Sequence, residues 1–260
     1  MMKKSACIET LFTELPFIAR FKAAKDAGFD CVEFWSWTDK NLDAVKTASE
    51  KAGIAIASMS GDRDFSLVDP EHKTRYIEFI RKSVDAAKKI DCGILVIHSN
   101  ALGEGGKVVD HYANLSHTVK LCSMFDTLKE LAPIAEKAGV VLVLEALNTT
   151  LDHVGNFLET TRMGAEMTRI IGSRNIKLLY DVYHMQMNEG SICDTLSAYA
   201  DQIGYIHAAD TPGRHEPGTG EINYAQVLRH LEKIGYAGIV GYELFPAKDS
   251  AAAVKAIMAL

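Results

Sequence analysis

Residues 136–145 read Glu-Lys-Ala-Gly-Val-Val-Leu-Val-Leu-Glu, and this stretch carries the pattern that decides the fold. A glycine behind a helical segment takes the left-handed conformation that ends the helix, and the apolar run after it is typical of a buried strand. The same order of helix, glycine and apolar run recurs at Gly28, Gly53, Gly93, Gly172 and Gly235. Such a recurrence indicates repeated βα units.

Eight short apolar runs predict strands at residues 5–8, 31–34, 54–59, 94–98, 140–145, 176–181, 205–207 and 239–243. Helical periodicity predicts helices near 15–27, 40–52, 70–90, 110–138, 157–171, 191–202, 222–234 and 248–259. Strict alternation of this kind predicts one (β/α)₈ TIM barrel forming a single domain over residues 1–260. The alternative, a doubly wound open sheet, would show a glycine-rich loop after its first strand, and residues 8–12 contain no glycine.

Composition limits the class of partner. The formal net charge is −6, which disfavours a nucleic-acid partner because phosphate binding needs a basic face. The five cysteines include no C-x-x-C pair, so we expect buried free thiols and a cytoplasmic setting. The sequence also offers no signal peptide and no uninterrupted apolar stretch of about 18 residues, so we expect no membrane span.

Four of the predicted strands end in an acid or an imidazole, namely Glu145, Asp181, His207 and Glu243. Such groups avoid a protein core unless they are paired or bind a metal. The carboxyl ends of the strands of a barrel share one face, so these four side chains should converge. A helix cap or a salt bridge is the alternative for any one of them taken alone.

Three carboxylates and one imidazole make a mainly oxygen-donor site. That set suits one divalent ion, Mn²⁺ or Mg²⁺ with Co²⁺ as a further candidate, better than a closed structural zinc site. A metal of this kind can polarise the carbonyl of a small hydroxy-carbonyl substrate. Glu145 and Glu243 are then the predicted acid–base pair for an isomerisation or epimerisation through an enediolate.

Two residues beyond these strand ends could bind substrate. His184 follows Asp181 by three residues and could hydrogen-bond a substrate oxygen, with a structural loop role as the alternative. Arg214 lies in the glycine-rich loop after the seventh strand and could hold a carboxylate bidentately. Its alternative is an ion pair with a glutamate of the same loop.

Other polar residues lie near the same predicted barrel mouth. Asn148 could contact substrate or steady its loop, and His98 ends the fourth predicted strand, where a supporting role is the alternative. Glu33 and Trp35 lie at the end of the second strand and could wall the substrate, although a structural role is favoured for them.

Three stretches resemble the hydroxypyruvate isomerase family of the xylose isomerase-like TIM-barrel superfamily. They are Tyr-Asp-Val-Tyr-His-Met-Gln at 180–186, Ile-Gly-Tyr-Ile-His-Ala-Ala-Asp at 203–210, and Arg-His-Glu-Pro-Gly-Thr-Gly-Glu-Ile-Asn-Tyr at 214–224. The resemblance implies interconversion of hydroxypyruvate and 2-hydroxy-3-oxopropanoate with two glutamates as the acid–base pair. It also implies a homodimer or homotetramer.

Two departures from that family leave the substrate open. Histidine at position 207 is similar to the ketose 3-epimerases of the superfamily, whereas hydroxypyruvate isomerases carry glutamine there. The loop Asn-Thr-Thr-Leu-Asp-His at 148–153 also differs from that of the enzymes with short substrates. A 2-oxo-tetronate isomerase and a ketose 3-epimerase therefore remain alternatives. A DNA-repair endonuclease of the same barrel is a more distant one.

Overall fold

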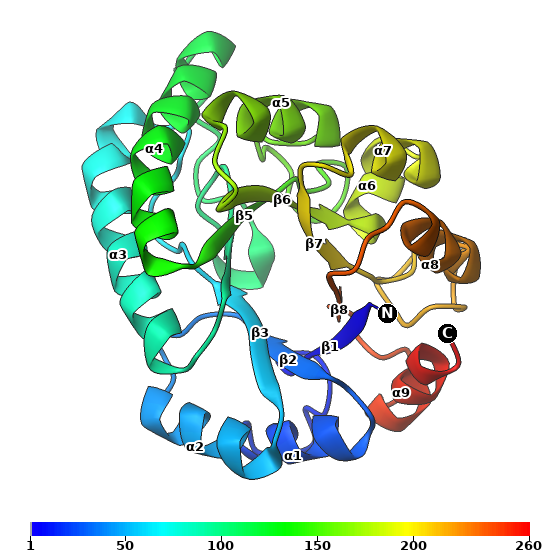
Figure 1. The fold of residues 1–260 in the computed structure, drawn as a ribbon. Coiled ribbons are helices and arrows are strands. Elements are labelled where there is room, and N and C mark those ends of the chain that lie inside the picture. The colour runs from blue at the N-terminus through cyan, green and yellow to red at the C-terminus, as the bar shows by residue number, and fades with distance from the viewer. Residues whose placement is uncertain (1) are drawn as a thin grey trace.

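Eight parallel strands close into a barrel, which Figure 1 shows along its axis. The structure is a computed structural model and describes residues 2–260. Each strand pairs with the next one in the sequence, and the last pairs with the first. The strands are β1 (Lys3–Cys7), β2 (Cys31–Phe34), β3 (Ala55–Ser60), β4 (Ile94–Ile97), β5 (Val141–Glu145), β6 (Ile176–Asp181), β7 (Ile203–His207) and β8 (Ile239–Tyr242). The predicted (β/α)₈ barrel is confirmed, and the open sheet is wrong.

Helices surround the barrel and cover the outer face of its strands (Figure 1). They are α1 (Ala19–Asp26), α2 (Leu42–Ala52), α3 (Lys73–Lys89), α4 (His117–Ala138), α5 (Thr161–Ile171), α6 (Val182–Asn188), α7 (Ile192–Tyr199), α8 (Tyr224–Lys233) and α9 (Ser250–Met258). Two short 3₁₀ helices, η1 (Pro70–His72) and η2 (Glu104–Gly106), lie in the loops before α3 and α4. Among the described residues, no helix is long and apolar enough to cross a membrane.

Several predicted boundaries need correction. α4 begins at His117 and not at 110, because the Ser116 side chain accepts a hydrogen bond from the Val119 N–H and caps the helix there. α6 was not predicted as a separate element. The expectation of a left-handed glycine holds for Gly53 and Gly139 but is wrong for Gly93.

The barrel interior is a small apolar cluster of one residue from each of six strands: Cys31, Ala57, Val96, Val143, Leu179 and Tyr205. A much larger core fills the space between strands and helices. Strand side chains alternate between the two faces, so a residue two positions after an interior one also points inward. That rule places the side chains at the strand ends over the closed interior, where they form the floor of a pocket.

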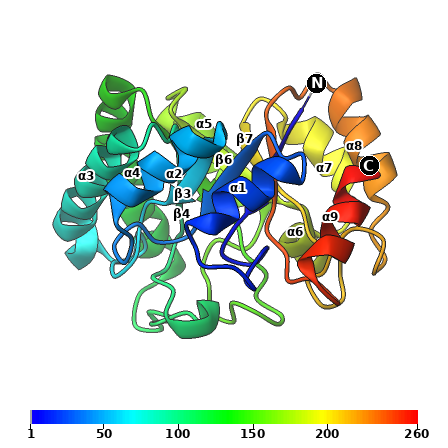
Figure 2. The same cartoon turned by 90° about the horizontal axis from the view of Figure 1, so that it is seen from below.

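The strand ends and the long loops lie on the same side of the barrel. Figure 2 shows the loops after β4 and β5, in green, extending from its lower side. This side holds the carboxyl ends of all eight strands, because the strands are parallel. Active sites of such barrels are built there.

Candidate metal and active site

Glu145, Asp181, His207 and Glu243 converge at the carboxyl face of the barrel. Each offers one donor atom, and these four atoms lie within 4.8 Å of one another. The first three end β5, β6 and β7 two positions beyond Val143, Leu179 and Tyr205 of the interior cluster, while Glu243 directly follows β8. The sequence therefore predicted their convergence correctly.

The donor set fits a divalent cation. Glu145 Oε1, Asp181 Oδ2 and both ring nitrogens of His207 are buried and have no hydrogen-bond partner within residues 2–260. Buried polar atoms are nearly always paired, so the two orphaned carboxylate oxygens beside the His207 ring fit a cation as their partner. Three carboxylates and one imidazole suit Mn²⁺ or Mg²⁺.

Asp181 has a separate task for each of its carboxylate oxygens. Oδ1 accepts hydrogen bonds from the backbone N–H groups of Tyr183 (2.8 Å) and His184 (3.2 Å), which caps α6. Oδ2 is left for the cluster. Burial raises the pKa of Asp181 to about 7, because Arg214 only partly compensates its charge. A cation at the cluster would supply the compensation that the protein lacks.

His207 is flanked by carboxylates. Its Nε2 lies 3.1 Å from Glu33 Oε1, and its Nδ1 lies 3.6 Å from Glu145 Oε1 and 3.5 Å from Glu243 Oε2. Glu33 reaches this position because Gly241 leaves the space free, since a Cβ there would be 2.4 Å from Glu33 Oε2. Because Glu33 lies beside Nε2, the ring nitrogen of His207 that faces Glu145 and Glu243 is Nδ1.

The two predicted catalytic glutamates have different neighbours. His98 lies between Glu145 Oε2, 3.2 Å from its Nε2, and Asp62 Oδ1, 3.0 Å from its Nδ1. Burial alone would raise the pKa of Glu145, but contacts with His207 and His98 hold this pKa well below its usual range. Glu145 is therefore ionised and able to accept a proton or hold a cation.

Glu243 is held in place by hydrogen bonds from Trp35 and Arg214. Trp35 Nε1 donates to its Oε1 at 2.6 Å, and Arg214 Nη2 donates to its Oε2. Burial would raise the pKa of Glu243, but the positive charge of Arg214 outweighs it and lowers this pKa. Arg214 Nη2 also lies 3.6 Å from Asp181 Oδ2, while Arg214 Nε is buried without a partner in the described chain.

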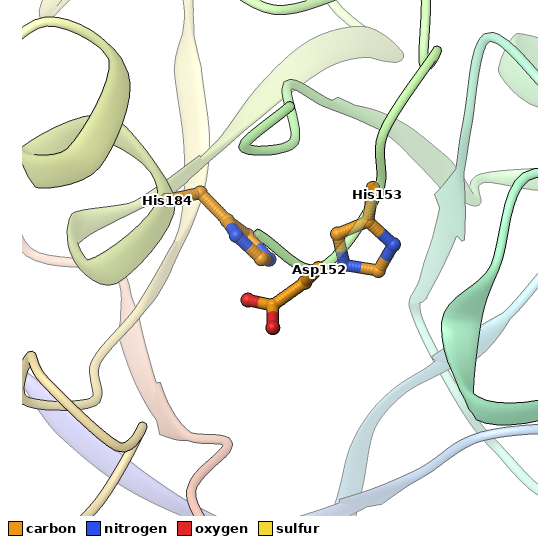
Figure 3. Close-up of side chains that lie close together, drawn as sticks. All are labelled: Asp152, His153 and His184. Atoms are coloured by element: carbon orange, nitrogen blue, oxygen red, sulfur yellow. The ribbon is translucent and has the colours of Figure 1, made fainter. Parts of the chain in front are cut away.

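A second group of polar side chains adjoins the cluster. Asp152, His153 and His184 also bring one donor atom each within 4.8 Å of one another, and Figure 3 shows both imidazoles beside the carboxylate. His184 Nε2 lies 3.6 Å from Asp181 Oδ2, which links the two groups. Asn148 donates to both Asp152 Oδ2 (2.8 Å) and His184 Nδ1 (2.7 Å).

These groups share one cavity of about 880 Å³. Its walls include aromatic and apolar side chains around the barrel mouth, among them Trp35, Leu147, Leu151 and Phe245 of the loops and Tyr183 of α6. A volume of this size exceeds what a three-carbon acid fills and matches pockets for larger small molecules.

The structure brings seven of the eight predicted site residues to this cavity or to the four-residue donor cluster, and Asn148 contacts Asp152 and His184 beside them. His98 directly follows β4 and does not end it, and His184 lies on α6 and not in a loop, which corrects both placements. Sequence reasoning missed Asp62 and His153. Asp62 lies in a loop after β3 and His153 in the loop after β5, and no periodic signal marks either residue in the sequence.

Comparison with known proteins places this barrel in a family. Residues 21–260 match the family described as xylose isomerase-like TIM barrel. Hydroxypyruvate isomerase of Escherichia coli is 30% identical over 268 residues, with 98% of each chain covered. A putative hydroxypyruvate isomerase of Streptomyces coelicolor is 32% identical, with 94% of this chain and 91% of that protein covered. The 2-oxo-tetronate isomerase of Pectobacterium atrosepticum is 28% identical, with 95% and 93% covered.

Solved structures agree on the fold. The AP endonuclease of family 2 from Brucella melitensis superposes with a TM-score of 0.88 at 22% identity, with 98% and 97% of the two chains covered. The 3-keto-D-glucoside 4-epimerase of E. coli gives 0.84 at 22% identity, with 99% and 98% covered. The chain belongs to the xylose isomerase-like TIM-barrel family, as the resemblance predicted. Its relatives above are isomerases by name, in agreement with the predicted enzyme class.

Proposed function

We propose that this protein is a metal-dependent isomerase of hydroxypyruvate or a short homologue of it. The observation that carries the proposal is the pair Glu145 and Glu243, which meet at one oxygen-rich donor cluster on the floor of a cavity. The names of the relatives support the reaction class. The product expected from hydroxypyruvate is 2-hydroxy-3-oxopropanoate.

Glu145, Asp181, His207 and Glu243 would hold one Mn²⁺ or Mg²⁺ ion, with Co²⁺ as a further candidate. When bound, such an ion polarises the substrate carbonyl and acidifies the neighbouring C–H bond. Ordinary thiolate-rich zinc sites have a different donor set.

Proton transfer is assigned to the two glutamates. One carboxylate removes the proton from the hydroxyl-bearing carbon, and the electron pair of that C–H bond forms the double bond of an enediolate while the carbonyl oxygen takes up negative charge. The hydroxyl proton passes to the oxygen of the former carbonyl, which becomes the new hydroxyl, and the old hydroxyl oxygen becomes the new carbonyl. The proton taken from carbon is then returned to the former carbonyl carbon. His98 positions Glu145, and Trp35 and Arg214 position Glu243.

Arg214 would bind the substrate carboxylate. Its Nε is buried and has no partner among residues 2–260, so a donor remains after Nη2 has paired with Glu243. The guanidinium also lies over the Tyr183 ring, 5.4 Å from the centroid, which fixes its plane. His184 and Asn148 would complete the substrate pocket.

The size of the cavity is also compatible with a substrate larger than hydroxypyruvate. About 880 Å³ is room enough for the four-carbon acid 2-oxo-tetronate or for a ketose, and a ketose 3-epimerase would use the same pair of glutamates. A nuclease role is disfavoured by the net charge of −6. We further expect a dimer or tetramer, which light scattering after gel filtration would establish.

The proposal is tested by following hydroxypyruvate and 2-oxo-tetronate by NMR with protein that has been stripped of metal and reloaded. We expect no conversion after chelation, and conversion of at least one acid with one equivalent of Mn²⁺ or Mg²⁺. Conversion of fructose or tagatose at C3, with both acids inert, would favour the epimerase. Full activity of the stripped protein would contradict a metal-dependent reaction.

A further inference from the structure

The second polar group presents two unused imidazole nitrogens to the cavity. His153 and His184 pack edge to face with their centroids 5.1 Å apart, close to the carboxylate of Asp152 (Figure 3). The Nε2 atoms of both rings are buried and, within the described chain, have no hydrogen-bond partner. Buried nitrogens of this kind require a partner, so each one is a candidate contact for a ligand.

The orientation of Asn148 decides which nitrogen of His184 carries the proton. Asn148 Oδ1 accepts hydrogen bonds from the backbone N–H groups of Leu151 (3.1 Å) and Asp152 (3.0 Å), which fixes the amide. Its Nδ2 can only donate, and it lies 2.7 Å from His184 Nδ1. His184 Nδ1 is therefore an acceptor, and the proton of the neutral ring is on Nε2.

His153 has the opposite tautomer. Its Nδ1 lies 2.7 Å from the carbonyl oxygen of Gly106, and a carbonyl can only accept, so Nδ1 carries the proton. The close approach needs glycine, because a Cβ at position 106 would be 2.9 Å from His153 Cε1. Burial lowers the pKa of His153, which keeps the ring neutral. Its Nε2 therefore presents a lone pair.

We propose that His153 and His184 form a subsite for a hydroxyl group of the substrate. His184 Nε2–H donates to the hydroxyl oxygen, and the hydroxyl donates its own proton to His153 Nε2. The two rings lie edge to face with their centroids 5.1 Å apart, and one oxygen within about 2.8 Å of each Nε2 would satisfy both nitrogens. A metal ion would need a lone pair on both nitrogens, and His184 offers a proton instead.

This inference rests on the proposed isomerase function and names its substrate more closely. In hydroxypyruvate the carbonyl and the hydroxyl are both used by the isomerisation, and the remaining group is a carboxylate. A carboxylate carries no proton and cannot donate to His153 Nε2. The subsite therefore selects a substrate with one more hydroxyl beside the reacting carbons, as the C4 hydroxyl of 2-oxo-tetronate provides.

Binding to the Mg²⁺-loaded protein tests the subsite without requiring turnover. The probes are 2-oxo-tetronate and 3-hydroxy-2-oxobutanoate, which differ only in the C4 hydroxyl, measured by calorimetry. We expect the hydroxyl to improve Kd at least about ten-fold, the value of one good hydrogen bond. Equal affinity of the wild-type protein for both probes overturns the subsite. A preference without turnover leaves the subsite standing and counts against the isomerase.

A matched pair of variants assigns the preference to one atom. His153→Asn keeps an N–H near the Nδ1 position but has no acceptor at Nε2, so the preference should fall to less than about three-fold. His153→Gln places an amide oxygen, which can accept a hydrogen bond, near the Nε2 position. This variant should retain most of the preference for the C4 hydroxyl. An unchanged preference in His153→Asn contradicts the assignment.

Nitrogen NMR of the ligand-free protein tests the tautomers directly. We expect the proton on Nδ1 of His153 and on Nε2 of His184, and any other arrangement overturns the proposed pair of contacts. A titration with Mn²⁺ should also give one equivalent per chain in the wild type and in His153→Asn. A second equivalent that this variant loses would make the group a metal site instead.

Discussion

The nitrogen that His207 turns toward the cluster is set by Glu33. Glu33 Oε1 faces His207 Nε2 at 3.1 Å, and its Oε2 accepts from the hydroxyls of Tyr205 and Ser58. Buried partners of this kind orient a histidine ligand and raise its basicity.

Glu33→Gln should therefore weaken Mn²⁺ binding by about 10–100-fold while the protein still folds. Calorimetric titration with Mn²⁺ measures the change, with far-ultraviolet circular dichroism as the check on folding. Glu50→Gln is the matched control, because Glu50 is an exposed glutamate on α2. If Glu33→Gln binds Mn²⁺ as tightly as the control does, Glu33 has no part in orienting the ligand.

The sequence alone was sufficient to predict the candidate site residues that lie at the ends of strands. Glu145, Asp181 and His207 could be predicted because a charge at the end of an apolar run is costly and the barrel topology makes such ends meet. Asp62 and His153 could not be predicted, because their contacts cross between loops. No periodicity encodes how a loop folds, so only coordinates show that Asp62 lies against His98.

The loop after β7 is organised around one buried carboxylate. Asp210 accepts hydrogen bonds from the backbone N–H groups of Thr211, Gly218, Gly220 and Ile222, at 2.9–3.0 Å. This network holds the loop that carries Arg214 beside Asp181 and Glu243 of the candidate metal cluster. The sequence showed a glycine-rich loop here but not the aspartate at its centre.

Gly220→Ala should disrupt this loop, because a Cβ at position 220 would be 2.1 Å from the Thr211 carbonyl oxygen. We expect a loss of about 1–3 kcal/mol in the free energy of unfolding, as in other overpacked sites. Urea denaturation measures it. Gly93→Ala is the control, since a Cβ there meets nothing within 4 Å and should cost less than about 0.5 kcal/mol. Equal stability of the two variants would contradict the role of the loop.

At the scale of whole elements, periodicity found every strand but not every helix. α6 follows β6 without a break, so no glycine or turn signal separates them. The Asp181 side chain caps α6 and at the same time faces the cluster. Because Asp181 is both the last residue of β6 and the cap of α6, the sequence contains no separate signal for the start of α6, and this helix was not predicted.

The whole barrel was predictable because its closure repeats one local pattern eight times. This pattern does not predict how deeply each side chain is buried in the folded protein. All five cysteines are free, as expected, but the expectation that they are buried is wrong for Cys122, which is exposed, and Cys193 is partly exposed. Burial raises the pKa of Cys31 and of Cys92 to about 12.

Thiol titration of the native protein at pH 8 should therefore label Cys122 rapidly and Cys193 slowly. Cys7, Cys31 and Cys92 are buried and should react only after denaturation. Mass spectrometry of the labelled peptides assigns the sites, and Cys122→Ser should remove the fast phase. Rapid labelling of the three buried thiols would mean that the barrel opens in solution.

The central claim is that Glu145 and Glu243 move a proton on a substrate held at the metal cluster. Its most direct test is the rate at which deuterium from D₂O enters hydroxypyruvate and 2-oxo-tetronate, followed by NMR with the Mg²⁺-loaded protein. We predict exchange at the carbon beside the carbonyl of at least one acid, and a rate lower by about 10²–10⁴-fold in both Glu145→Gln and Glu243→Gln. Exchange at the wild-type rate in either folded variant would contradict the account.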